Sequence, residues 1–141
     1  MSPTAKPTDW KTEPMPNETG SLHFPRIFSS GEFERVKMGL IPREMEDKWF
    51  IYYDNQTLNI HRSWTGFHIY SINILPHEDN TYSITRTIVN RNKEQYNQQN
   101  NAYDVSLLNY LIDRLLLGKA VPFQYQRIYP KKTAQFISIQ W

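Results

Sequence analysis

Apolar and polar residues alternate along four successive segments in the middle of the chain. The segments are rich in β-branched and aromatic residues, which favour strands, and they cover 48–54, 57–64, 67–75 and 81–90. Asn55-Gln56 and Thr65-Gly66 can form tight turns between the first three segments. The pattern therefore predicts an antiparallel sheet of about four strands within residues 48–90.

A helical repeat follows this predicted sheet. Val105, Leu108, Ile112 and Leu115 recur at helical spacing. We expect a long helix over 102–117, packed on one face of the sheet, and hence an α+β fold.

The residues before the sheet contain two further signals. Residues 1–20 hold four prolines among polar residues, which predicts a disordered or extended tail. Ser29 and Glu32 fit a capping box, so a short helix is expected over about 32–40. The remaining chain, 21–141, has the size of a single α+β domain.

Composition excludes several classes of protein. Sixteen basic and 14 acidic residues give a net charge of +2, too balanced for a duplex nucleic-acid binder with its basic stripe. The chain has no cysteine, which excludes disulfides and thiolate metal sites. No apolar run reaches the roughly 18 residues that cross a bilayer, and no signal-peptide stretch is evident. We therefore expect a cytoplasmic protein without membrane contact.

Strand alternation places two arginines in apolar rows. With Asn55-Gln56 as the turn, Trp49 lies opposite Arg62, and with Thr65-Gly66 as the next turn, Arg62 faces Ile69. Arg62 could then bind phosphate beside Trp49 and Trp64. The alternative is a cation–π contact, or a salt bridge to the acidic segment 44–47.

The position of Arg86 depends on the loop that precedes its strand. A five-residue loop pairs Leu75 with Thr81 and places Arg86 beside Tyr70 and His61, on the face opposite Arg62. A four-residue loop shifts the register by one residue, and Arg86 then joins Arg62. The face with His61 is also half apolar, so we expect the tails or a homo-oligomer to cover it.

The candidate ligand-binding residues fall into four chemical groups. Arg62 and Arg86 would neutralise phosphate, aromatic rings would stack on a base, hydroxyl and imidazole groups would form hydrogen bonds, and a carboxylate would hold a ribose. The full set is Glu44, Asp47, Trp49, His61, Arg62, Ser63, Trp64, Thr65, Tyr70 and Arg86. Ser63 lacks a nucleophile-elbow context, and the histidines lack a carboxylate that would complete a metal set. We expect no catalytic residue, metal or cofactor.

The segment REMEDKWFIYYDNQTLNIHRSWTG resembles a family of small uncharacterised bacterial and phage segments. The shared pattern is approximately M-x-D-[KR]-W-F-I-Y, a short hairpin, then H-R-S-W-T-G, and it covers about a quarter of the chain. Some members occur next to macro-type or ADP-ribose-handling domains. The resemblance implies an association with ADP-ribose-type or nucleotide signals. In a phage, it is similar to small oligomeric proteins that sequester host immune nucleotide signals.

These observations together predict a binding protein that captures a phosphorylated, nucleotide-derived small molecule of the ADP-ribose or cyclic-nucleotide type. In a phage it would act as an anti-defence sponge in the host cytoplasm. One alternative is a hydrolase for the same ligands, using His61 with Glu44 or Asp47. A second is a protein–protein interaction or inhibitor module, using the second apolar face and the segment 136–141.

Overall fold

A six-stranded antiparallel sheet forms the centre of the protein in the computed structural model, which describes residues 4–123. The strands are β1 (Thr19–Leu22), β2 (Ile27–Phe28), β3 (Trp49–Asp54), β4 (Thr57–Arg62), β5 (His68–Pro76) and β6 (Tyr82–Asn90). Their order across the sheet is β1-β6-β5-β4-β3, and β2 also pairs with β6.

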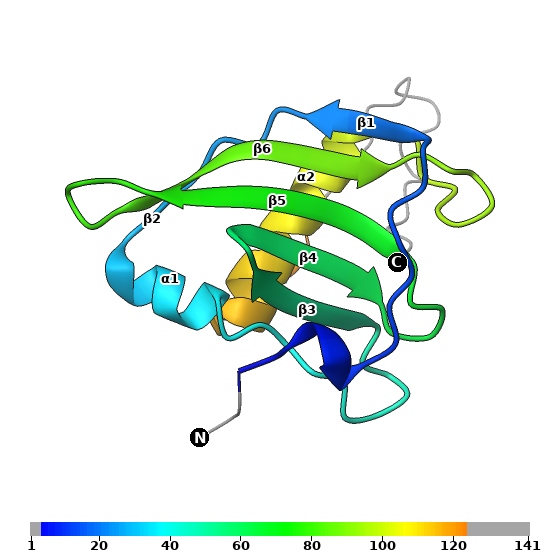
Figure 1. Ribbon diagram of the computed structural model, residues 1–141, viewed down its shortest axis with the longest axis horizontal. Helices are drawn as coiled ribbons and strands as arrows, with labels where there is room; N and C mark the ends of the chain where they lie inside the picture. Colours follow the sequence, from blue (N-terminus) through cyan, green and yellow to red (C-terminus); the bar gives the residue numbers. More distant parts are fainter. Residues whose placement is uncertain (1–3, 124–141) are drawn as a thin grey trace, which may run out of the picture.

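Helical segments lie around this sheet. They are the 3-10 turn η1 (Pro7–Asp9), the helix α1 (Ser30–Val36), and the helix α2 (Asn101–Tyr110) with its π-helical continuation η2 (Leu111–Leu116). Figure 1 shows α2 crossing one face of the sheet diagonally, whereas the N-terminal segment passes in front of the other face. No helix between residues 4 and 123 has the length and apolar character that a bilayer crossing needs.

The predicted fold of about four strands with a long helix is wrong. The protein is mostly a six-stranded antiparallel sheet, and its C-terminal helix is short, with 16 residues. β1 and β2 have only four and two residues, so they carry no alternating pattern that could reveal them. Both add to β6 as antiparallel partners, which covers hydrogen-bonding groups that an edge strand would expose.

The capping box before α1 is confirmed. Ser29 Oγ accepts a hydrogen bond from the Glu32 amide at 3.1 Å, and the Glu32 carboxylate accepts one from the Ser29 amide at 2.9 Å. The helix that follows is shorter than expected and ends at Val36. Gly39 then adopts a φ of +69°, and the turn that contains it leads to a bridge between Leu40 and Ile51 at the edge of β3.

The hairpin β3–β4 has the predicted register. Trp49 pairs with Arg62, Ile51 with Ile60, and Tyr53 with Leu58. The turn residues Asn55 and Gln56 have φ values of 55° and 61°. Positive φ at both residues gives a two-residue turn the same twist as the strands that it joins.

The register predicted between β4 and β5 is wrong. Ile60 pairs with Tyr70 and His61 pairs with His68, so Ile69 is an extra residue in β5. This β-bulge moves Tyr70 and Ile72 from the face where they were expected to the face covered by α2. β4 also ends at Arg62, and the amide of Arg62 bonds to Phe67 O at 2.9 Å, which leaves Trp64 in the turn.

Neither register proposed for Arg86 occurs. Pro76 still belongs to β5 and pairs with Tyr82, and a second irregularity follows Asn73, so Arg86 pairs with Asn73. Asn73 in turn pairs with Thr57, the neighbour of buried Leu58. Arg86 is therefore exposed on the face opposite α2.

Hydrogen bonds attach the N-terminal segment to the rest of the fold. The Ala5 amide bonds to Met38 O at 2.8 Å, the Trp10 indole N–H to Ser63 O at 2.7 Å, and the Glu13 amide to Gly66 O at 2.8 Å. Ala5 is buried. The segment 136–141, expected as part of the surface of a possible interaction module, lies outside the described residues.

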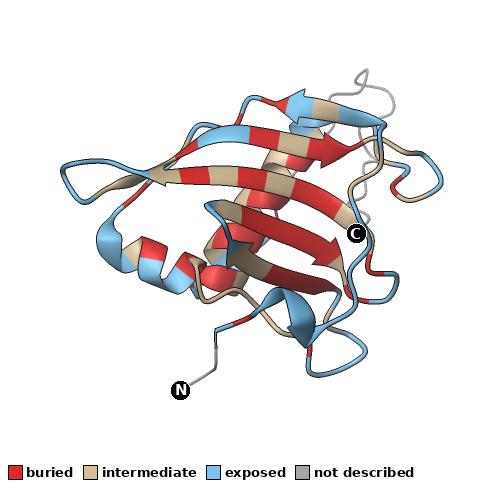
Figure 2. Ribbon diagram, in the orientation of Figure 1, coloured by how far each residue is buried: buried red, intermediate tan, exposed pale blue. Residues whose placement is uncertain are grey.

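The core lies between the sheet and α2. Figure 2 shows buried residues concentrated along the central strands and on the helix, whereas α1 and β1 are largely exposed. Its fully buried side chains include Ile51, Leu58, Ile60, Tyr70, Ile72, Leu108, Leu111 and Ile112. This packing of the sheet against α2 fixes the start of β3, at Trp49, and the end of β4, at Arg62, beside the helix.

Candidate ligand-binding cavity

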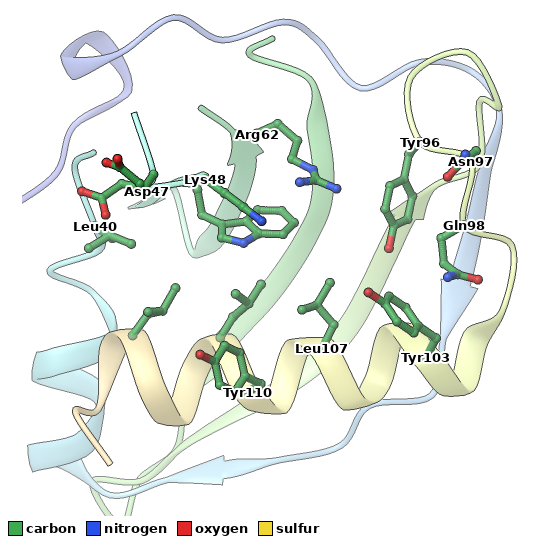
Figure 3. Close-up of a pocket in the computed structure, with 14 residues that line it drawn as sticks. Leu40, Asp47, Lys48, Arg62, Tyr96, Asn97, Gln98, Tyr103, Leu107 and Tyr110 are labelled. Atoms are coloured by element: carbon green, nitrogen blue, oxygen red, sulfur yellow. The ribbon is translucent and has the colours of Figure 1, made fainter. Parts of the chain in front are cut away.

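A cavity of about 550 Å³ opens between α2 and the strand ends that carry Trp49 and Arg62 (Figure 3). Its other walls are the loop before β3 and the loop 91–100. The lining residues are Leu40, Glu46, Asp47, Lys48, Trp49, Arg62, Tyr96, Asn97, Gln98, Tyr103, Leu107, Tyr110, Leu111 and Leu115. The helix forms the floor because Tyr103, Leu107, Tyr110 and Leu111 are spaced to share one face.

Arg62 extends over this floor from the end of β4. The carbon at the centre of its guanidinium lies 4.7 Å from the ring centroid of Trp49, its cross-strand partner. Within residues 4–123, the Arg62 side chain has this cation–π contact and no hydrogen-bond or ion-pair partner. Its donors are therefore available to a group that enters the cavity, and the guanidinium plane suits phosphate or carboxylate.

Asp47 has a structural role beside Lys48, at the end of the cavity furthest from Asn97 and Gln98. Its carboxylate accepts hydrogen bonds from the amides of Arg43 at 2.9 Å and Glu44 at 3.2 Å. Ser63 Oγ donates to Asp47 O at 2.6 Å and ties this loop to the end of β4. These bonds hold the loop so that Lys48 lines the cavity as a second cation near Arg62.

A buried polar network fixes the wall formed by loop 91–100. The hydroxyl groups of Tyr70 and Tyr96 both donate to Asp104 Oδ1, at 2.6 and 2.5 Å. Arg91 Nη2 lies 2.7 Å from Asp104 Oδ2, and Asp104 is fully buried. Burial, together with the nearby carboxylate, raises the pKa of both tyrosines. They stay protonated and donate to Asp104 across the physiological pH range.

The cavity brings together only part of the predicted site. Asp47, Trp49 and Arg62 line it. Glu44, Ser63 and Trp64 instead line a second, open hollow of about 580 Å³ beside Trp10 and Met45. Thr65 is exposed in the turn, where its hydroxyl accepts a hydrogen bond from the Phe67 amide at 3.2 Å.

His61 lies on the face of the sheet opposite α2. Its ring stacks on His68 with centroids 4.3 Å apart, and on Tyr52 at 5.6 Å. His61 Nδ1 lies 2.9 Å from Gly66 O. Burial lowers its pKa, although this hydrogen bond acts in the other direction. His61 is therefore a neutral packed residue in this structure, outside the cavity.

Tyr70 and Arg86 are also outside the cavity. Tyr70 is fully buried and bonded to Asp104, so its ring has no surface on which a ligand could stack. Arg86 is exposed on the opposite face of the sheet from α2. Of the two arginines expected to act together on phosphate, only Arg62 faces the cavity.

The structure adds cavity residues that sequence reasoning missed. The sequence pattern includes Lys48 only as a residue of the shared motif. Tyr103 and Tyr110 lie at i and i+7 on α2, a spacing that could have placed them on one face. Tyr96, Asn97 and Gln98 come from a polar loop without periodicity. No sequence signal placed that loop beside Arg62.

The described part of the chain, residues 4–123, holds no group of three histidine, aspartate or glutamate side chains placed to bind a metal ion. The cavity instead combines two cations, the two acidic residues Glu46 and Asp47, an aromatic and aliphatic floor, and amide side chains. We found no match to this chain among protein-family models, curated proteins or solved structures. Among the groups that line the cavity, the Arg62 guanidinium can donate to an anionic group, and the floor offers apolar surface to a ligand.

Proposed function

We propose that this protein binds a phosphorylated, nucleotide-derived small molecule in the cavity between α2 and the β3–β4 hairpin. One observation carries the proposal: the Arg62 side chain stacks on Trp49 inside the cavity and makes no hydrogen bond or ion pair to residues 4–123. A cation directed into a partly enclosed site favours an anionic ligand, because charge-assisted bonds are stronger away from bulk water.

Size and shape support the same ligand class. A volume of about 550 Å³ lies within the range of small-molecule sites, roughly 300–1,000 Å³. Tyr103, Tyr110 and Leu107 supply apolar surface along the floor, while Lys48 and Arg62 supply positive charge above it (Figure 3). Tight capture, as in an anti-defence sponge that acts as a homo-oligomer, needs only these binding groups.

Isothermal titration calorimetry tests the proposal. The ligands are ADP-ribose, cyclic ADP-ribose variants and cyclic dinucleotides, with unphosphorylated nucleosides for comparison. We expect heat only with phosphorylated ligands and a loss of about 1.5–3 kcal/mol of binding free energy for Arg62→Ala, since a charged hydrogen-bond partner is removed.

Arg86→Ala is the matched control, because it deletes the same charge from an exposed site outside the cavity. Its affinity should equal that of the wild type. The proposal is wrong if no phosphorylated ligand binds, or if both arginine variants lose affinity equally. Chromatography of the ligand recovered after denaturation separates capture, which returns it intact, from hydrolysis.

A further inference from the structure

Two amide side chains form the end of the cavity furthest from Asp47 (Figure 3). Asn97 is exposed at the mouth of the cavity, and its side chain makes no hydrogen bond within residues 4–123, so its carbonyl and its NH₂ group are open both to solvent and to a ligand. Gln98 Oε1 accepts hydrogen bonds from the amides of Gln99 at 3.1 Å and Asn100 at 3.0 Å. Its Nε2 is thereby the group left to donate to a ligand.

The backbone around Asn97 is held on both sides. Tyr96, the preceding residue, is anchored by its hydroxyl to Asp104 at 2.5 Å. Gln98, the following residue, is anchored by its carbonyl to Arg91 Nη1 at 2.9 Å, and the same arginine pairs with Asp104. Asn97 is therefore presented to the cavity by a preorganised loop, although the loop has no regular secondary structure.

The two ends of the cavity differ in chemistry. Lys48 and Arg62 offer only donors, which suit phosphate oxygens. Asn97 offers a donor and an acceptor side by side, which complements a ring edge that carries an acceptor and a donor, as nucleobases do. The Tyr103 ring lies near this end, in a T-shaped contact with Phe123 at 5.6 Å between centroids, and adds aromatic surface beside the amides.

We propose that Asn97 and Gln98 read the edge of a nucleobase, and that Tyr96 and Asp104 position them. This inference rests on the proposed function and extends it: the ligand is selected by its base as well as by its phosphate. Asn97 is the specificity-determining contact, whereas Tyr96 acts through the loop.

Competition binding with defined probes tests this inference. The probes are the four common ribonucleoside diphosphates and ribose 5-phosphate. For the wild type we expect a ranking among the four bases. Asn97→Ala should lower affinity for the preferred base at least tenfold, bring the four bases within about threefold of one another, and change ribose 5-phosphate binding less than twofold.

Two further variants separate a specific role from a general structural one. Glu94→Ala changes an exposed residue of the same loop outside the cavity, and it should leave the base ranking intact. Tyr96→Phe removes only the hydroxyl that bonds Asp104, and it should reduce base discrimination while ribose 5-phosphate binding stays constant.

The outcomes distinguish the two proposals. If wild-type protein binds none of these probes and none of the ligands above, the proposed function fails and this inference falls with it. If Arg62→Ala weakens all nucleotides while Asn97→Ala changes neither affinity nor ranking, only the base-edge inference is overturned. An equal loss for nucleotides and ribose 5-phosphate in Asn97→Ala would also overturn it.

Discussion

The imidazole rings of His61 and His68 stack across β4 and β5, with centroids 4.3 Å apart and planes 12° apart. The Nε2 atoms of both rings are buried without a hydrogen-bond partner among residues 4–123. Gly66 O accepts a hydrogen bond from the Glu13 amide and also lies 2.9 Å from His61 Nδ1. The histidine stack is thus joined to the point where the N-terminal segment attaches.

This stack predicts that the protein loses stability in mild acid. Burial, followed by the charge of His61, lowers the pKa of His68 to about 4, and burial lowers the pKa of His61. The unfolded chain, with histidines titrating near 6.5, therefore binds more protons than the folded one below that pH. The free energy of unfolding should fall by roughly 1–2 kcal/mol between pH 6.5 and 5 through His68, and His61 should act in the same direction.

Urea unfolding at several pH values between 7.5 and 5 measures this slope. His68→Phe keeps an aromatic ring in the stack without a titrating group, and it should flatten the slope. His77→Gln is the control, because it removes a histidine from an exposed loop outside the stack, and its slope should stay steeper than that of His68→Phe. A wild-type stability that is constant from pH 7 to 5 would contradict the prediction.

Replacement of Asp104 should strongly destabilise the fold. Its carboxylate is fully buried, pairs with Arg91, and accepts hydrogen bonds from Tyr70 and Tyr96. Asp104→Ala removes the ion-pair partner of the half-buried Arg91 and the shared acceptor of two buried hydroxyl groups, which should lower the free energy of unfolding by about 3–5 kcal/mol. Chemical denaturation followed by tryptophan fluorescence measures the change.

Glu34→Ala supplies the comparison for an exposed ion pair. Glu34 and Lys37 lie 2.6 Å apart, but both side chains are largely in solvent. The expected change is within about 0.5 kcal/mol. Equal losses of unfolding free energy in the two variants would show that the buried Asp104 network stabilises the fold no more than an exposed ion pair does.

Two glycines should respond in opposite directions to alanine. A Cβ on Gly39 would lie 2.1 Å from Ile51 O, and the residue has a φ of +69°. Gly39→Ala should therefore lower the free energy of unfolding by about 2–3 kcal/mol. A Cβ on Gly31, within α1, would have no neighbouring atom within 4 Å, so Gly31→Ala should raise it by up to about 1 kcal/mol. Thermal unfolding of both variants gives the sign of each effect.

The turn between β3 and β4 offers a stabilising substitution. Gln56 has a φ of 61° and is exposed, a conformation that costs a non-glycine residue about 1 kcal/mol. Gln56→Gly should raise the free energy of unfolding by about 0.5–1 kcal/mol, whereas Gln56→Val should lower it. Urea titration of the pair checks the prediction, and stabilisation by valine would argue against the turn conformation.

The local sequence was sufficient for interactions between residues close along the chain. Trp49 was expected opposite Arg62, and the structure has that pair because alternation and a two-residue turn leave one register between the two strands. The capping box at Ser29 could also be predicted, because its two hydrogen bonds join residues only three positions apart in the sequence. The cation–π contact of Arg62 with Trp49 was also foreseen as an alternative.

Features that depend on distant segments were decided by the tertiary structure. The bulge at Ile69 moved Tyr70 to the helix face, where Asp104 could bond its hydroxyl, and no local pattern marks that extra residue. β1 and β2 are too short to form strands unless the open edge of β6 pairs with them. Neither feature is visible in a single segment of the sequence.

The candidate site shows the same division. The sequence by itself determined that Arg62 and Trp49 share one end of a hairpin, because strand geometry links cross-strand neighbours. It was tertiary packing that brought α2 and the loop 91–100 to that end, opened a cavity beside Arg62, and placed Arg86 on the opposite face. Alternation along β4 had already predicted that His61 lies on the face opposite Arg62. This division has a physical reason. Turn chemistry and strand alternation act between residues that are close along the chain, whereas contacts between distant segments depend on the packing of the whole core.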